Sequence, residues 1–215
     1  MPLQIQTATP RDSVQLTTVF LAAFSDPFNL TLFPRTPDVR AWWEDKFARE
    51  AVAPGQVLLK VVDAPDASSS TGGNEGGEGE GEIAAFAIWK FPKDQSREKQ
   101  KEVGQEEEEE GKWPKSSDPT LCQRFFGGMA AKREEYMGSK PHYYLDMLGT
   151  HPSYNGKGIA SMLLKWGLDR ADNDKVPVFL SASPAGKPVY ERRGFWVVQE
   201  EEVAGGYVQA YMVRD

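Results

Sequence analysis

Cysteine and histidine are scarce in this chain of 215 residues, which contains one cysteine and two histidines. Cys122 has no second cysteine to pair with, so neither an intrachain disulfide nor a cysteine-based zinc site can form. His142 and His151 lie nine residues apart and give no support to a metal site with two histidines. We therefore expect no bound metal.

Long apolar runs are absent as well. No run approaches the roughly eighteen apolar residues that a membrane-spanning helix needs. The first six residues contain no basic segment followed by an apolar one, as a secretory leader would. We expect an intracellular, cytoplasmic protein that does not enter the membrane.

A basic excess is also missing. The net charge is −7, but acidic residues are concentrated in residues 64–82, which contain no basic residue, and in residues 93–118. The remainder of the chain is close to neutral and has no stripe of lysine and arginine. It lacks the electrostatic footprint of a duplex-binding protein, so we do not expect nucleic acid as a partner.

The length suits a single domain, residues 1–215, that carries two acidic insertions. Residues 64–82 are mainly Ser, Gly and Glu, and residues 93–118 include five consecutive glutamates. Such segments bury too little apolar area to offset the entropy of ordering them, so we expect flexible loops. They are either acidic interaction segments or tolerated loop growth, and composition alone favours the second interpretation.

Outside the insertions, apolar residues recur with the spacing of helices and strands. Thr36 can cap a helix whose apolar face includes Trp42 and Trp43, which we interpret as core residues rather than a ligand platform. The first insertion is expected to join two strands as a hairpin, and the whole pattern indicates an α/β (α+β) fold with a central mixed sheet. The predicted helices cover residues 16–24, 36–47, 120–136, 158–172 and 186–193, and the predicted strands residues 4–7, 57–62, 83–89, 143–148, 178–181, 195–198 and 207–213.

The loop between residues 149 and 157 joins a predicted strand to the N-terminus of a predicted helix. Unpaired N–H groups and the helix dipole make such a place an anion site. Gly156 and Gly158 would let a phosphate approach the backbone, and Lys157 would add a positive charge. The loop fits neither Walker A, because Gly158 follows Lys157, nor the dinucleotide fingerprint, because Ser161 replaces its last glycine.

This loop resembles the acyl-CoA loop of the GCN5-related N-acetyltransferases (GNAT), whose signature is Gln/Arg-x-x-Gly-x-Gly/Ala. A second family hallmark, Tyr-x-x-x-Gly-Phe, has its counterpart in Tyr190 to Phe195, and residues 8–24 resemble the first strand and helix of the family. The resemblance covers roughly 170 residues and is greatest to the antibiotic-acetylating branch that includes puromycin acetyltransferase and fungal relatives of unknown substrate. It implies a mixed sheet of about seven strands with helices on both faces, and acetyl-CoA as co-substrate.

The resemblance also implies roles for individual residues. The Leu148 N–H would donate to the thioester carbonyl, and Tyr190 would protonate the departing thiolate. Two departures concern the cofactor: Asn155 stands where the family has Gln or Arg, and the loop that begins at Ser183 lacks the Asn that commonly holds the pantetheine arm. The implied cofactor contacts are Leu148, Gly149, Thr150, Asn155, Gly156, Lys157, Gly158, Ile159, Ala160, Ser161 and Ser183.

The general base is less constrained by the sequence. Alternation along the strand places Tyr144 and Asp146 on the same face as Leu148, which makes Asp146 the first candidate. Water relayed through backbone carbonyls is the alternative.

The function expected from this resemblance is transfer of an acetyl group from acetyl-CoA to a primary amine of a small molecule, by direct attack in a ternary complex. Cys122 lies outside the motif, so an acyl-cysteine route is not indicated. The alternatives are acetylation of a protein or peptide amine, and a catalytically silent acyl-CoA-binding module. The oligomeric state is left open.

Overall fold

The computed structural model describes residues 3–63, 81–92 and 113–215. The predictions made for residues 64–80 and 93–112 lie outside these ranges. Two ends of the predicted insertions lie within the described residues: Glu82 is the first residue of the third strand, and residues 113–118 pack against the body. The Trp113 ring stacks on Phe126 with centroids 5.0 Å apart, and Ser116 donates its backbone N–H to Asp38 at 2.9 Å.

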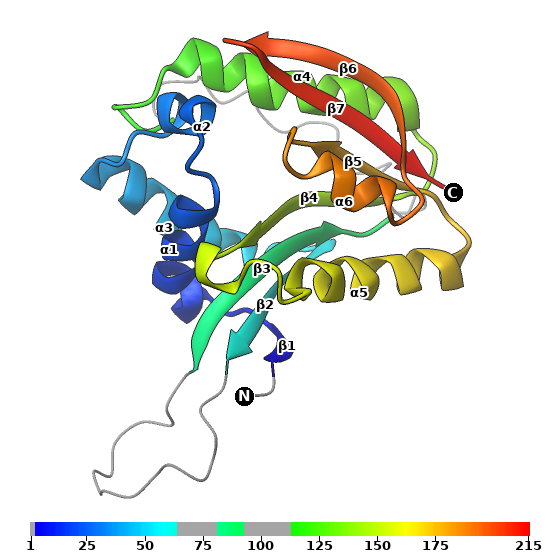
Figure 1. Cartoon of the computed structure of the whole chain (residues 1–215), viewed down its shortest axis with the longest axis horizontal. Helices are drawn as coiled ribbons and strands as arrows, with labels where there is room; N and C mark the ends of the chain where they lie inside the picture. The colour runs from blue at the N-terminus through cyan, green and yellow to red at the C-terminus, as the bar shows by residue number, and fades with distance from the viewer. Residues whose placement is uncertain (1–2, 64–80, 93–112) are drawn as a thin grey trace, which may run out of the picture.

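Seven strands form one mixed sheet in the order β1-β2-β3-β4-β5-β7-β6, which confirms the expected fold class (Figure 1). β2 and β3 pair as the predicted antiparallel hairpin, and β4 and β5 are the parallel pair. The strands are β1 (Leu3–Thr7), β2 (Gln56–Asp63), β3 (Glu82–Lys90), β4 (Tyr143–Thr150), β5 (Val178–Ala182), β6 (Trp196–Ala204) and β7 (Tyr207–Arg214).

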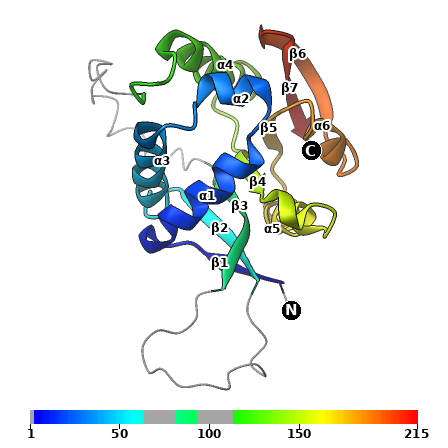
Figure 2. The same ribbon diagram turned by 60° about the vertical axis from the view of Figure 1, so that its left-hand side comes forward.

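Helices cover both faces of the sheet: α1, α3 and α4 lie on one side, and α5 and α6 on the other (Figure 2). Among the described helices, none is both long and apolar enough to cross a membrane. The helical segments are η1 (Pro10–Asp12), α1 (Ser13–Ala23), α2 (Pro27–Leu32), α3 (Pro37–Glu50), α4 (Pro119–Met137), η3 (Pro152–Tyr154), α5 (Ile159–Asp174) and α6 (Lys187–Glu191).

The largest differences from the sequence prediction concern α2 and β6. α2 was not predicted, because its six residues are too few for a periodic pattern; the side chain of Asp26 caps it by accepting from the Asn29 N–H at 3.2 Å. β6 extends six residues beyond the predicted end at Val198. Its second half contains Glu200 to Glu202, which masked the alternation of a strand.

The core lies on both faces of the sheet. On the α1 and α3 side, Trp43 is fully buried and packs on Phe20 with ring centroids 3.6 Å apart. Trp42 is only half-buried and also lines a cavity. The prediction that both tryptophans are core residues is therefore fully confirmed only for Trp43. On the other side, the Trp89 indole of β3 packs against α5 and donates to the Leu163 carbonyl at 3.2 Å.

We predict that Gly167→Ala destabilises the fold by about 2 kcal/mol, because a Cβ at this α5 position would overlap the buried indole of Trp89. The clash outweighs the gain of about 1 kcal/mol that alanine brings inside a helix. Gly128→Ala on α4 is the matched control. Its Cβ would meet only the Tyr211 hydroxyl at 3.7 Å, so we expect it to be neutral or stabilising. Urea unfolding of both variants measures the difference, and equal stabilities would contradict the prediction.

Candidate active site

β4 and β5 run side by side for only three residues before they part. Their register pairs Tyr143 with Val178 and ends at Leu145 with Leu180, although β4 continues to Thr150. Beyond this point, no strand in the described part of the chain pairs with the edge of β4 that faces β5. The sheet therefore opens into a gap between two adjacent strands.

Main-chain groups of β4 point into this gap. The His151 N–H donates to the Ala84 carbonyl at 2.8 Å, and hydrogen-bonded pairs alternate along an antiparallel ladder. In the register of β3 and β4, Gly149 therefore belongs to the next hydrogen-bonded pair. The N–H and C=O groups of Leu148 and Thr150 are turned away from β3, toward the gap.

A bulge in β4 changes which side chains share a face. Met147 pairs with Ile88 but Leu145 pairs with Trp89, so Asp146 has no partner on β3. Leu145 and Leu148 consequently lie on the same face of β4, although they are three residues apart. Both pack into the core on the α5 side of the sheet. The expectation that Asp146 shares the face of the Leu148 side chain is wrong, because strict alternation ignores the extra residue.

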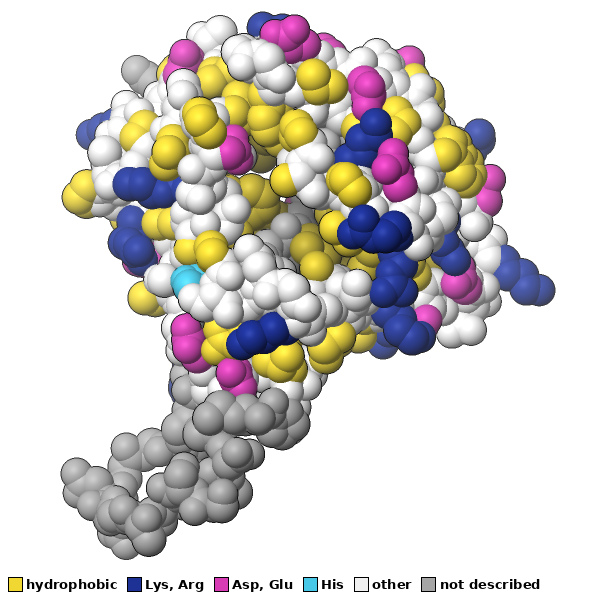
Figure 3. All heavy atoms as spheres, viewed as in Figure 1, with side chains coloured by type: hydrophobic (Ala, Val, Ile, Leu, Met, Phe, Trp, Pro, Cys, Tyr) yellow, Lys and Arg dark blue, Asp and Glu magenta, His cyan; other side chains and the backbone are white. Residues whose placement is uncertain are grey.

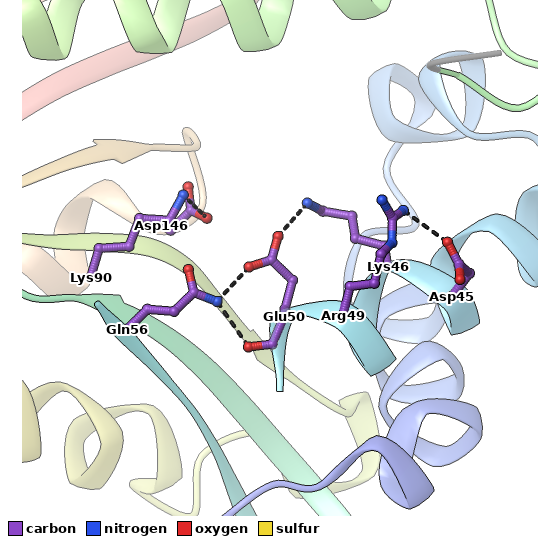
Figure 4. Close-up of polar contacts among 7 residues, drawn as sticks. All are labelled: Asp45, Lys46, Arg49, Glu50, Gln56, Lys90 and Asp146. Carbon is purple, nitrogen blue, oxygen red and sulfur yellow. Dashed lines mark hydrogen bonds and ion pairs between the residues drawn. The ribbon is translucent and has the colours of Figure 1, made fainter. Parts of the chain in front are cut away.

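Tyr144 and Asp146 do share a face, as expected, and both line the same cavity. Burial raises the pKa of Tyr144 well above its usual value, and the charge of Asp146 adds to the effect. The phenol of Tyr144 therefore stays neutral. Lys90, the last residue of β3, forms an ion pair with Asp146 at 3.0 Å (Figure 4).

The N-terminus of α5 is open to solvent. Gly156 and Gly158 adopt left-handed φ angles of 78° and 75°, and a Cβ on either would meet nothing within 4 Å. Within the described residues, no acceptor is recorded for the N–H groups of Gly156, Gly158 and the first α5 residues. Residues 155–158 are exposed, while Ile159 is buried and Ala160 and Ser161 are half-buried.

Lys157 is exposed, and its side chain lies over the ring of Tyr154. The Nζ atom of Lys157 is 4.3 Å from the ring centroid. Tyr154 is buried and donates its hydroxyl to Asp63 at 3.0 Å, so the base of the loop is tied to β2. The charge of Lys157 is held beside the free N–H groups.

A small cavity of about 90 Å³ lies at the gap between β4 and β5. Three residues singled out from the sequence, Leu148, Asp146 and Tyr190, line it together, as does Ser183. Figure 3 shows the molecule hollowed in this region, between α1 and α6, with hydrophobic side chains inside and lysine and arginine side chains beside α6.

Tyr190 lies on α6 and is 9% exposed. Burial raises its pKa to about 12, and its hydroxyl has no hydrogen-bond partner among the described residues. The Ser183 hydroxyl accepts from the Gly186 N–H at 3.1 Å, so this side chain shapes the turn before α6. The phenol of Tyr190 is neutral at physiological pH and free to donate.

Gln209 and Tyr207 of β7, which the sequence analysis missed, also line the small cavity. The Oγ1 atom of Thr150 and the Oε1 atom of Gln209 are buried, with no partner in the described part of the chain. Tyr207 of β7 lines the same cavity and stacks on Phe28 of α2 with ring centroids 4.0 Å apart. Its contact with α2 is a long-range contact that no local pattern could indicate.

A larger cavity of about 720 Å³ lies between α3, α4 and the ends of β3 and β4. Aromatic and charged side chains line it, and it shares Phe126, Met129, Asp146 and Met147 with the small cavity. Asp146 therefore stands where the two cavities meet. Figure 4 shows further ion pairs in this region, Lys46 with Glu50 and Arg49 with Asp45.

The two histidines are far from equivalent. His142 is buried beside α4, where its Nε2 accepts from the Arg133 Nε at 2.8 Å. His151 accepts a weak bond from the Ser153 N–H at 3.3 Å in the turn before η3. Among the described residues, no group of three or more His, Cys, Asp or Glu could hold a metal ion. Cys122 lies on α4, buried away from both cavities.

Comparison with protein families finds one matching region. Residues 123–214 match the model of a family described as "Acetyltransferase (GNAT) domain". A protein called acetyltransferase from Stachybotrys chartarum is 33% identical over 90 residues, which are 40% of this chain and 38% of that protein. The uncharacterised N-acetyltransferase YafP of Escherichia coli is 37% identical over 65 residues, 30% of this chain and 41% of that protein. Each match thus spans about two fifths of the relative's length.

Solved structures share the fold over the whole chain. A histone acetyltransferase HPA2 and related acetyltransferase from Corynebacterium glutamicum has a TM-score of 0.60 and 22% identity, covering 100% of this chain and 96% of that one. The PaiA N-acetyltransferase of Thermoplasma acidophilum, solved with coenzyme A, has a TM-score of 0.53 and 14% identity, covering 100% and 99%. At these identities the likeness concerns the fold alone.

We predict that Gly156→Ala weakens coenzyme A binding about tenfold, because alanine at φ 78° would shift the N–H groups that meet an anion. Gly206→Ala is the matched control: it has the same φ of 78° and free space, but lies in the turn between β6 and β7. Both variants should lose about 1 kcal/mol of stability. Calorimetric titration with coenzyme A separates them, and equal affinities would remove the loop from the binding site.

Proposed function

We propose that this chain, whose residues 123–214 match the model of the GNAT acetyltransferase domain, acts as a GNAT acetyltransferase and transfers an acetyl group from acetyl-CoA to a primary amine of a small molecule. One observation carries the proposal. The gap between β4 and β5 brings the main-chain N–H of Leu148 and the phenol of Tyr190 to one small cavity, next to the open N-terminus of α5.

Coenzyme A would be held mainly by backbone groups. The N–H groups of residues 156–161, including Gly156 and Gly158, would take the diphosphate, where the helix dipole and Lys157 favour negative charge. The backbone of Thr150 would pair with the pantetheine arm as a neighbouring strand would. Backbone donors tolerate Asn155 in place of a longer side chain, because the side chain is not the principal contact.

The acetyl group would occupy the small cavity, whose volume of about 90 Å³ suits a two-carbon acyl group. The amine nitrogen attacks the thioester carbon, a C–N bond forms and the C–S bond breaks. The Leu148 N–H donates to the oxygen that becomes negative, an interaction of about 3 kcal/mol in the transition state. Because this donor belongs to the backbone, its position depends on the bulge beside it.

Tyr190 would stabilise the departing thiolate by a hydrogen bond. Burial raises the pKa of Tyr190 to about 12, whereas a thiol has a pKa of about 8.5. Complete transfer of the phenolic proton to the sulfur is therefore uphill. The neutral phenol remains a hydrogen-bond donor, and solvent protonates the thiolate to the thiol after release.

Asp146 is the candidate base for the proton of the attacking amine. It faces the large cavity, from which an acceptor would come, and the small one, where the acetyl group would lie. Lys90 fixes the carboxylate by its ion pair at 3.0 Å. After attack the nitrogen is cationic and strongly acidic, so a carboxylate suffices to remove its proton.

The large cavity favours a small acceptor. Its volume of about 720 Å³ lies within the range of small-molecule sites. Other proteins of this fold act on other amines: one is named as a ribosomal-protein-S18-alanine N-acetyltransferase from Escherichia coli. An assay should therefore compare small amines with peptides that have a free amine.

The test is release of free thiol from acetyl-CoA with a panel of small primary amines and of peptides with free N-termini. We expect turnover with small amines above the rate without acceptor, and weaker turnover with peptides. Acetyl-CoA binding without turnover of any amine would contradict the proposal and favour a silent binding module.

We predict that Tyr190→Phe lowers kcat about 10- to 100-fold, the effect of one hydrogen bond to a charged group. Because the raised pKa keeps the phenol protonated up to about pH 12, the rate of the native chain should not fall through pH 10 on account of Tyr190. Tyr143→Phe is the control, since its hydroxyl bonds Asp174 outside both cavities. A fall near pH 10 that Tyr190→Phe abolishes would refute this assignment.

We predict that Asp146→Asn lowers kcat about 100-fold, because the amide cannot accept the amine proton. Asp169→Asn on α5, whose partner Lys165 is exposed, is the control and should change kcat less than twofold. The pH–rate profile of each variant is the measurement. If Asp146→Asn kept both the rate and the acid limb of the profile, water would be the better candidate for the base.

A further inference from the structure

Arg133 of α4 is fixed on two sides at the wall of the large cavity. Its Nε donates to the Nε2 of His142 at 2.8 Å, and its guanidinium lies over the Tyr144 ring, 4.3 Å from the centroid. The Nδ1 of His142 is 2.6 Å from the Lys140 carbonyl, so His142 donates there and accepts from Arg133. His142 and the Tyr144 ring thus orient the guanidinium, and no carboxylate takes part.

The other cations at this cavity have carboxylate partners. Lys46 pairs with Glu50 at 2.7 Å and Lys90 with Asp146 at 3.0 Å, as Figure 4 shows. Arg49 pairs with Asp45 at 2.9 Å. Within the described ranges, Arg133 is the one cation lining the cavity that has no carboxylate within ion-pair distance.

Partial burial makes it costly for the Arg133 guanidinium to have no carboxylate in contact. Burial lowers the pKa of Arg133, which reflects the cost of removing a guanidinium from water. The charges of Asp146 and Glu134 act on Arg133 from beyond ion-pair distance, and a half-buried guanidinium without a carboxylate in direct contact is further stabilised by an anion that reaches it. The Nη1 and Nη2 groups have no acceptor in the described part of the chain, and a guanidinium edge binds a carboxylate through two parallel hydrogen bonds.

The proposed reaction determines where such an anion would come from. Arg133 and the Lys90 that holds Asp146 both lie over the Tyr144 ring, at 4.3 and 5.7 Å from its centroid. Arg133 is therefore a close neighbour of the candidate base. A molecule whose amine reaches Asp146 would present its next functional group to Arg133.

We propose that the acceptor is an amine that also carries a carboxylate, an amino acid or a similar amino carboxylate, and that Arg133 binds this carboxylate. The inference rests on the proposed acetyl transfer and adds the class of acceptor. Trp42, Trp113 and Phe126 line the same cavity and would contact an apolar part of the molecule.

The experiment measures kcat/KM for pairs of acceptors that differ only in charge: a panel of amino acids and the corresponding amino acid carboxamides. The native chain should prefer the acids at least tenfold. Arg133→Gln should lose about 10- to 100-fold with the acids and little with the amides, so that the ratio approaches one. Arg133→Lys should restore part of the preference.

Arg124→Gln is the matched control, because Arg124 lies on the same helix but contacts the Glu202 carbonyl outside both cavities. It should keep the preference for acids. Equal or better turnover of the amides by the native chain would overturn the proposal, and so would a preference that survives Arg133→Gln. Thermal stabilisation by acetyl-CoA is measured in parallel. If it is retained while no acid is acetylated, the acceptor class is wrong; if it is absent, the proposed acetyl transfer itself fails.

Discussion

The early end of pairing between β4 and β5 is the constraint on which the site depends. Parallel strands normally satisfy each other's backbone groups along their length, and a buried unpaired group costs about 1–3 kcal/mol. Here the pairing stops at Leu145 and Leu180, although β4 continues for five more residues. The N–H and C=O groups on the β5 side of residues 146–150 are therefore not paired with β5. A ligand that lay beside β4 as a strand would could form hydrogen bonds with them.

The bulge at Asp146 determines on which face of β4 the side chains next to the gap lie. Without it, strict alternation along β4 would carry the Asp146 and Leu148 side chains to one face. The extra residue instead lets Leu148 pack toward α5 while Asp146 faces the large cavity. One local irregularity thus turns the Leu148 side chain away from the face that carries the Asp146 carboxylate.

The sequence predicted features that depend on local chemistry. Helix and strand spacing located most elements. The glycines at 156 and 158 do adopt left-handed φ angles, and the anion site expected beside them stays a prediction. The bulge could not be predicted, because it depends on the register between β3 and β4 rather than on residue types. α2 was missed because six residues are too few for periodicity, and the contact of Arg133 with His142 joins a helix to the strand end that follows it.

The two cavities differ in whether backbone groups or side chains supply their polar groups. At the gap, the groups available to the cofactor are largely N–H and C=O groups of β4 and α5, whose positions follow from the fold and change little with the residues that carry them. In the large cavity, by contrast, the polar groups are side chains of α3, α4 and the strand ends, such as Lys90 and Arg133. Substitutions there alter the charge offered to an acceptor without disturbing the gap. In the proposed reaction, the fold could therefore keep one acyl donor while its acceptor changes, and the guanidinium of Arg133, which has no carboxylate in contact, would select the acceptor by its charge.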